Sequence, residues 1–237
     1  MPSEPRPPRR LTVAERRFAE RKDELSKLGL SDRFARIYAT NLWSDPETRS
    51  GVGSRLDSTR VVRAALPETL RKLKARVLLD VPCGDFMWME HVDLTGIQYI
   101  GGDIVGSIVE QNQRRRGNES RRFMRLDLTR DELPEADVLL CRDCMVHLSY
   151  ANIRAALANI ARSKIRYLLM TSFPGRADNY DVTDGDWRAL DFQASPFFFP
   201  EPVLTIVEEC EEEEGSYADK SLVAWEVRDL PRLIPKP

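Results

Sequence analysis

The sequence predicts an α/β fold in which a mostly parallel sheet carries helices on both faces, preceded by a helical N-terminal cap. Strand-like and helical segments alternate through the middle of the chain, which is the pattern of strand-helix-strand units. Two late strand-like segments, residues 203–207 and 222–227, have no clear helical pattern between them, so we expect a C-terminal antiparallel hairpin. The 237 residues are enough for one sizeable hydrophobic core.

Residues 11–75 are expected to form the N-terminal helical cap. Residues 11–29 place apolar side chains on one helical face, and Gly29 follows as a stop signal. Residues 31–41 predict a second short helix, and residues 43–56 are rich in Ser and Gly and predict a loop.

A third helix of the cap follows that loop. Asp57 can cap its start, and Pro67 is expected to kink or split it. The main domain then runs over residues 76–230. Its expected strands are 77–81, 98–104, 123–128, 136–141, 167–171, 203–207 and 222–227, and its main helices are 105–115 and 150–162.

Composition limits the broad class of the protein. Residues 1–10 are rich in proline and arginine, which predicts a disordered tail. They lack the apolar stretch of a secretory signal, so no such signal is expected. No apolar run approaches the ~18 residues that a membrane span needs. Four cysteines are too few for a disulfide scaffold at this length, so we expect a cytoplasmic protein.

Basic residues outnumber acidic ones in the first 76 residues, and the reverse holds in the rest of the chain. Solvated helix faces are the simplest interpretation, and a surface for phosphate, a membrane or an acidic partner is the open alternative. Because these basic residues are not interleaved with aromatics, a nucleic-acid partner is not expected.

The most informative stretch is the end of the first expected strand, where an apolar run carries Asp80 and then breaks into Pro-Cys-Gly-Asp-Phe at residues 82–86. Asp103 ends the second strand, where an acid can accept both hydroxyls of a ribose. A glycine-rich phosphate loop is absent, and Asp80 and Asp85 would repel a pyrophosphate. This acidic turn therefore favours a cofactor with a cationic end.

These residues resemble the ordered motifs of class I S-adenosylmethionine-dependent methyltransferases, over roughly residues 76–228. The resemblance implies a Rossmann-like seven-stranded sheet and S-adenosyl-L-methionine as the cofactor. More narrowly, the chain resembles a bacterial subgroup with a Pro-Cys-Gly-Asp-Phe first loop. The motifs that carry the resemblance are Asp80-Val-Pro-Cys-Gly84, Gly102-Asp103-Ile104, Leu126-Asp127-Leu128 and Cys141-Arg-Asp-Cys-Met-Val-His147-Leu148.

The resemblance also implies cofactor-binding roles. Asp80 and the first loop would hold the methionine amino group and the sulfonium side, Asp103 the ribose hydroxyls, and Asp127 the adenine amino group. Pro82 and Phe86 depart from the pattern, because glycines are usual at both positions. Asp85 could have a role or be a solvent-facing turn acid. The full cofactor-binding set is Asp80, Pro82, Cys83, Gly84, Asp103, Ile104, Asp127, Leu128 and Arg142.

Two residues after the fourth strand are candidate catalytic bases. Transfer to a hydroxyl benefits from a base within hydrogen-bond reach, whereas a neutral amine needs little more than desolvation. His147 has an ordinary pKa near ~6.5, which suits a base, but a structural role is the alternative. Asp143 is the competing base.

The acceptor is expected to bind between the N-terminal cap and the long segment after the fifth strand. The candidate residues are Tyr38, Trp43, Arg60, Asn179 and Trp187. Aromatic side chains beside carboxylates and amides suit a sugar.

Three further features have simpler interpretations. At least two of the aromatics in 197–199 are expected to pack on the sheet. The acidic run 208–214 predicts a solvated hairpin loop. Cys141 and Cys144 form a C-x-x-C pair that is better explained by packing than by a metal or redox site, so no metal is expected.

The sequence therefore predicts a methyltransferase that acts on a hydroxyl of a carbohydrate or another small polar metabolite. The partner is expected to be a small molecule or a glycan. One alternative is an N-methyltransferase acting on a small molecule or a protein. Another is a non-catalytic module that binds S-adenosylmethionine. The oligomeric state is not specified.

Overall fold

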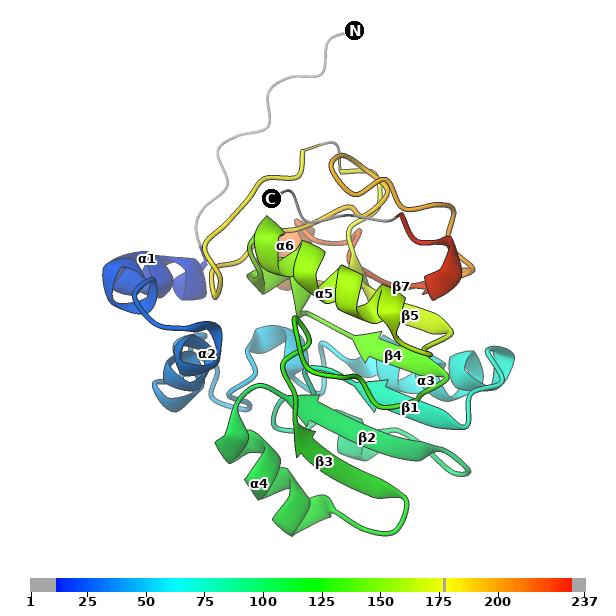
Figure 1. The fold of residues 1–237 in the computed structure, drawn as a ribbon. Helices are drawn as coiled ribbons and strands as arrows, with labels where there is room; N and C mark the ends of the chain where they lie inside the picture. The colour runs from blue at the N-terminus through cyan, green and yellow to red at the C-terminus, as the bar shows by residue number, and fades with distance from the viewer. Residues whose placement is uncertain (1–11, 177, 232–237) are drawn as a thin grey trace, which may run out of the picture.

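One seven-stranded sheet with strand order β3-β2-β1-β4-β5-β7-β6 forms the centre of the molecule (Figure 1). The computed structural model describes residues 12–176 and 178–231. Strands β1 to β5 run parallel, and β7 is antiparallel to both of its neighbours, so the predicted fold class and C-terminal hairpin are confirmed. The strands are β1 Val77–Asp80, β2 Gln98–Asp103, β3 Arg121–Arg125, β4 Val138–Cys141, β5 Tyr167–Ser172, β6 Leu204–Val207 and β7 Ser221–Glu226.

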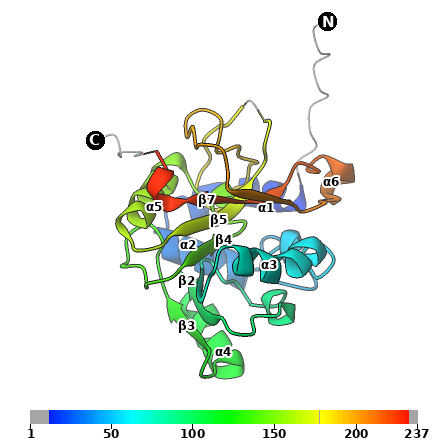
Figure 2. The same ribbon diagram turned by 90° about the vertical axis from the view of Figure 1, so that its right-hand side faces the viewer.

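Helices cover both faces of this sheet. Figure 2 shows α3 and α5 on opposite sides of it, and α1 and α2 belong to the N-terminal part of the chain. The helices are α1 Val13–Leu25, α2 Leu30–Ala39, α3 Arg60–Lys72, α4 Gly106–Arg116, α5 Tyr150–Arg162 and the single turn α6 Glu212–Gly215. Among the described residues, no helix combines the length and the apolar character that a membrane crossing requires.

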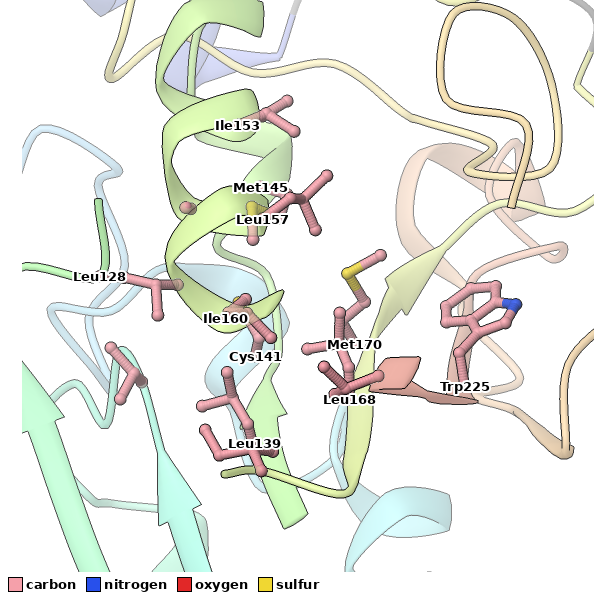
Figure 3. Packing of buried hydrophobic residues seen from close by; sticks show 14 of the residues in the cluster. Leu128, Leu139, Cys141, Met145, Ile153, Leu157, Ile160, Leu168, Met170 and Trp225 are labelled. Carbon is pink, nitrogen blue, oxygen red and sulfur yellow. The ribbon is translucent and has the colours of Figure 1, made fainter. Parts of the chain in front are cut away.

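The hydrophobic core follows from the two-residue period of the central strands. Leu79 and Leu139 pack under α5, whereas their neighbours Leu78 and Val138 pack under α3. Figure 3 shows the α5 side, where Ile153, Leu157 and Ile160 of the helix meet side chains of β4, β5 and β7. Strands that bury both faces hold the sheet in one register, so the side chains that follow each strand have fixed positions.

Several expected boundaries are corrected. Gly29 is the N-cap of α2 rather than the stop of α1, which ends at Leu25. Thr59, not Asp57, occupies the N-cap of α3. This helix continues past Pro67 without splitting, and its buried residues include Leu66 and Leu70 on either side of the proline. The expected tail, residues 1–10, lies outside the described residues.

Two of the three aromatics in 197–199 pack inside the protein, as expected. Phe197 contacts the rings of Tyr150 and Phe192, and Phe199 contacts Phe192 and Trp225. The side chain between them, Phe198, is 65% exposed. Adjacent residues in one loop therefore have opposite environments.

This contrast gives a matched test of the core. We expect Phe197→Ala to lower the free energy of unfolding by about 3–5 kcal/mol, because it leaves a cavity among packed rings. Phe198→Ala, the control at the next position, is expected to change it by less than about 0.5 kcal/mol. Urea unfolding followed by circular dichroism measures both values, and equal losses would contradict the assigned packing.

Candidate functional site

A cavity lies at the carboxyl ends of β1, β2 and β4, where the strand order reverses; we call it the switch-point cavity. Open α/β sheets bind ligands in this crevice. The cap closes it on one side through Tyr38 and Trp43. Its walls also include Leu30, Phe34, Ser50, Ser54, Asp80, Val81, Pro82, Cys83, Gly84, Asp85, Trp88, Asp103, Ile104, Val105, Ile108, Leu126, Asp127, Leu128, Thr129, Arg142, Asp143, Cys144, His147 and Leu148.

The loop after β1, residues 82–86, which we call the first loop, has backbone N–H groups that are hydrogen-bonded within the protein. Pro82 has no N–H, and the Cys83 N–H donates to the Gly102 carbonyl at 2.8 Å. The Gly84 N–H donates to Asp103 Oδ2 at 3.1 Å, and the Asp85 N–H donates to Ser50 Oγ at 3.2 Å. A phosphate would need several free amides here. The amides from Cys83 to Asp85 are therefore not free to bind a pyrophosphate.

Two carboxylates at the ends of the strands are buried beside this loop. Asp103 Oδ1 accepts the Val105 N–H at 2.9 Å, and Asp80 Oδ2 accepts the Tyr99 hydroxyl at 2.6 Å. Burial raises the pKa of Asp80 to about 7 and that of Asp103 to about 6. Each Asp103 oxygen accepts one backbone N–H and keeps a second lone pair. These acids can therefore accept further hydrogen bonds or hold a cation.

Asp127 lies in the same cavity, after β3, but it already has partners. Its Oδ1 accepts from the Thr129 hydroxyl at 2.6 Å, and its Oδ2 pairs with exposed Arg130 at 3.0 Å. Ile104 and Leu128 add apolar wall on either side of the strand-end acids. This part of the cavity suits a flat, largely apolar ring system.

Asp85, whose role the sequence leaves open, connects the cap to the first loop by hydrogen bonds. Its Oδ2 accepts the Thr48 hydroxyl at 2.6 Å and the Arg49 N–H at 3.2 Å. Gly84 has φ +53°, and a Cβ at this position would lie 2.6 Å from Ser50 Oγ. Asp85 is therefore not a solvent-facing turn acid, because its carboxylate holds residues 48–51 against the first loop.

Packing explains why a phenylalanine, Phe86, stands where the resemblance leads us to expect a glycine. Its ring is buried in edge-on contact with Tyr99 and Phe123, at centroid distances of 5.2 and 5.1 Å. The backbone there has φ +62°, a region that glycine adopts most easily. The aromatic residue keeps the glycine-like turn and fills the core beneath it.

A second cavity adjoins the first, and we call it the outer cavity. The two share Trp43, Ser50, Asp143 and His147, so these four residues mark the junction. The rest of the outer cavity is lined by Thr12, Val13, Ala14, Glu15, Phe18, Ser44, Asp45, Gly51, Val52, Gly53, Arg55, Phe173, Gly185, Asp186, Trp187, Cys210, Glu212, Glu213, Tyr217 and Lys220.

His147 stands at the junction in a fixed orientation. Its ring lies 4.9 Å from the ring of Trp43, and its Nδ1 is 2.8 Å from the Asp186 carbonyl oxygen. A carbonyl only accepts, so Nδ1 carries the proton and Nε2 keeps a lone pair. Burial lowers the pKa of His147 to about 4, against the opposing effects of this bond and of Asp143. The ring is therefore neutral near pH 7.

Asp143, the competing base, belongs to a cluster of charges. Its Oδ2 lies 2.7 Å from Lys220 Nζ and 3.2 Å from Arg142 Nη1. These cations hold the pKa of Asp143 well below its ordinary value despite burial. Arg142 in turn makes a two-point ion pair with Glu208, at 3.1 and 2.6 Å. Asp143 is thus a weaker base than an ordinary aspartate.

The structure separates the predicted acceptor-binding residues into two groups. Trp43 and Trp187 line the outer cavity, and Tyr38 lines the switch-point cavity. Arg60 and Asn179 line neither cavity. Arg60 pairs with Glu209 on the surface, and the Asn179 side chain bonds the backbone of its own segment. The contacts of these two residues are explained by local structure.

Two members of the charge cluster, Glu208 and Lys220, are not predicted from the sequence. The acidic run 208–214 predicts a solvated loop, but the Glu208 side chain is buried and ion-paired with Arg142. Lys220 lies in the wall of the outer cavity. An isolated lysine after an acidic run gives no sequence signal, because its partner Asp143 is 77 residues away.

Cys141 and Cys144 are both free, Cys141 being buried at the end of β4. Hydrogen bonding to Cys144 and burial raise the pKa of the Cys141 thiol well above its usual range. No group of three or more His, Cys, Asp or Glu side chains is placed to hold a metal ion within residues 12–176 and 178–231.

The protonation state of His147 can be measured directly. We expect its ring resonances not to titrate between about pH 8 and 5.5, since burial places the pKa near 4. Because the unfolded ring titrates near ~6.5, the neutral ring contributes stability above that pH, and this contribution is lost as the pH falls toward 4. Proton NMR of the ring, assigned by loss of the signal in His147→Gln, tests this. A midpoint near 6.5 would contradict a ring whose pKa is lowered by its surroundings.

Comparison with known proteins gives likenesses of fold only. No protein-family model matches the chain, and no curated protein matches it. The PH0226 protein from Pyrococcus horikoshii OT3 aligns over 71% of this chain and 89% of its own, with 14% identity and a TM-score of 0.48. The N-methyltransferase NodS from Bradyrhizobium japonicum WM9, in complex with S-adenosyl-L-homocysteine, aligns over 58% and 73%, with 12% identity and a TM-score of 0.46.

The methyltransferase domain of bacterial CtHen1 aligns over 50% of this chain and 66% of its own, with 14% identity and a TM-score of 0.43. This chain thus spans just under two thirds of that domain.

Proposed function

We propose that this protein is an S-adenosylmethionine-dependent methyltransferase. The observation that carries the proposal is the composition of the switch-point cavity. Buried carboxylates at the ends of β1 and β2 stand beside a loop whose amides from Cys83 to Asp85 are already bonded. Such a site disfavours a pyrophosphate and suits a cofactor with ribose hydroxyls, an ammonium group and a cationic sulfur.

The residues fit the parts of this cofactor. Asp103 has lone pairs left for the ribose hydroxyls, and Asp80 can hold the ammonium group. Ile104 and Leu128 offer apolar contacts to the adenine. Asp127 would accept a hydrogen bond from the adenine amino group, in addition to its present contacts with Thr129 and Arg130. The bound cofactor would supply an electrophilic methyl group, so the protein must mainly position the acceptor and move its proton.

The proposed acceptor is a hydroxyl of a carbohydrate or another small polar metabolite in the outer cavity. A hydroxyl that reaches the junction meets His147, whose Nε2 keeps its lone pair while Nδ1 is held by the Asp186 carbonyl. The O–H of the acceptor becomes far more acidic as its oxygen gains the methyl group. A ring with a pKa near 4 can therefore still take this proton.

The cofactor assignment predicts a binding defect in Asp103→Ala. We expect its affinity for S-adenosylhomocysteine to fall by about 100-fold or more, because two bonds to a charged acceptor are lost at about 1.5 kcal/mol or more each. Isothermal titration calorimetry measures the dissociation constant. Because the amide of Asp103→Asn can accept only one of the two backbone N–H bonds that Asp103 accepts, circular dichroism and thermal unfolding must show that both variants are folded.

Glu110→Ala is the control, since this exposed acid on α4 lines neither cavity. It should bind the cofactor product like the natural sequence. If the natural protein itself does not bind S-adenosylhomocysteine, or if Asp103→Ala binds it equally well, the cofactor assignment is wrong.

The role of His147 predicts a loss of turnover without loss of cofactor binding. We expect His147→Gln to lower kcat by about 10²- to 10⁴-fold, which is the usual contribution of a general base. Its dissociation constant for S-adenosylhomocysteine should stay within about threefold of the natural one. Transfer of a labelled methyl group to the acceptor measures kcat, and calorimetry gives the dissociation constant.

Two alternatives have distinct outcomes in the same experiments. Full activity of His147→Gln would favour transfer to nitrogen, because a neutral amine needs no proton acceptor before attack. Tight cofactor binding without transfer to any acceptor would favour a non-catalytic binding module.

A further inference from the structure

One segment of the chain holds the whole backbone of the turn that carries His147. This turn, Met145–His147, is a short 3-10 helix after β4, and we call it the His147 turn. All three of its carbonyl groups accept hydrogen bonds from residues 185–188, the bridging segment: Met145 O from Arg188 Nη1 at 2.9 Å, Val146 O from the Arg188 N–H at 3.1 Å, and His147 O from the Gly185 N–H at 2.7 Å. The Asp186 carbonyl of the same segment bonds to His147 Nδ1. The bridging segment therefore fixes both the backbone and the ring of His147.

Arg188, which makes two of these bonds, is fully buried. Its Nε donates to the Tyr180 carbonyl at 3.2 Å, and its guanidinium lies 5.7 Å from the centre of the Tyr150 ring. Asp181 and Asp184 favour its charge electrostatically, but their carboxylates accept hydrogen bonds from other groups. Burial lowers the pKa of Arg188 to about 10, so the side chain is still protonated at pH 7.

Stability alone does not account for a guanidinium at this position. Among the described residues, its Nη2 has no hydrogen-bond partner. A buried cation is costly unless bonded groups compensate it fully, whereas a methionine would fill the space without that cost. What Arg188 adds is a positive charge and donors of fixed direction at the Met145 and Tyr180 carbonyls. Its chemistry is therefore directed at the His147 turn.

The bridging segment is itself supported by the cap. Buried Arg33 of α2 donates to the Asp184 carbonyl at 3.1 Å and lies 3.4 Å from Asp184 Oδ2. Gly185, with φ +92°, is pressed against the cap, because a Cβ there would lie 2.6 Å from Ile37 and 3.0 Å from Phe18. The segment thus contacts the cap on one side and the His147 turn on the other.

We propose that Arg188 is a positioning residue for methyl transfer, which holds the His147 turn and so keeps the imidazole at the junction of the two cavities. This inference rests on the proposed function and adds a residue to it. Arg188 lines neither cavity, so it acts through His147 and does not touch the acceptor.

The titration of His147 reports on this role. Three charged groups act on its ring: Asp143 raises the pKa of His147, whereas Arg188 and Lys220 lower it. Removing the Arg188 charge should therefore raise this pKa. Loosening of the turn, which would let water reach the ring, acts in the same direction. A loss of stability elsewhere in the protein would not change the surroundings of the ring.

Proton NMR of the full chain tests the proposal with Arg188→Met and Arg188→Lys. We expect Arg188→Met to raise the pKa of His147 from about 4 toward the ordinary value of ~6.5. Arg188→Lys keeps the charge and should leave this pKa near 4. His91 is the other histidine of the chain, so its ring signals are the internal reference.

Ile160→Val is the matched control for stability, because this buried residue of α5 lines neither cavity. Thermal unfolding shows whether each variant is folded during the titration. If Arg188→Met does not fold, Arg188→Gln gives the same test, since it removes the charge and keeps a donor. The inference is overturned if the neutral variant keeps the His147 pKa near 4, or if Ile160→Val raises it equally.

Methyl transfer from labelled S-adenosylmethionine to glucose, galactose and mannose gives a second readout. We expect Arg188→Met to lower kcat by about 10- to 100-fold, as a small displacement of a catalytic group does. Arg188→Lys should recover part of this loss, and both variants should bind S-adenosylhomocysteine within about threefold of the natural chain.

The failures of the two proposals are distinguishable. Equal kcat for the natural chain and Arg188→Met would overturn the positioning role and leave the proposed function intact. Failure of the natural chain to bind S-adenosylhomocysteine would overturn the proposed function, and the titration would still decide whether Arg188 holds His147.

Discussion

One buried carboxylate, that of Asp103, joins the two loops on which the candidate site is built. It accepts the Gly84 N–H from the loop after β1 and the Val105 N–H from the loop after β2. Both loops leave neighbouring parallel strands at the same edge of the sheet, so one side chain can bond to both. These two backbone amides are then not available to bind a phosphate. The same interaction thus shapes the cavity and disfavours a pyrophosphate.

The cap is tied to this centre by a second carboxylate. Asp85 holds the 48–51 loop, and that loop brings Ser50 and the nearby Trp43 to the junction of the two cavities. The walls of both cavities therefore include residues of this loop, which is hydrogen-bonded to Asp85 of the first loop. A shift of the first loop would move both walls together.

The two candidate bases are distinguished by their surroundings. Asp143 lies between Arg142 and Lys220, which stabilise its ionised form and weaken it as a base. His147 is held neutral by burial, and its tautomer is set by the Asp186 carbonyl. In the proposed transfer to a hydroxyl, the imidazole would therefore be the group that takes the proton, and Asp143 would hold the two cations in place.

The fold class, the strand that precedes each motif and the acids at the ends of β1 and β2 are all predicted from the amino-acid sequence. These follow from patterns local in the chain: alternating hydrophobicity, apolar runs and breaks at Pro and Gly. Which distant residues meet is seen only in the folded molecule. The pairing of Arg142 with Glu208, the tie between Asp85 and Thr48, and the exclusion of Arg60 and Asn179 from both cavities depend on contacts between separate segments. Such contacts depend on how whole elements pack, and neighbouring residues carry no signal of them.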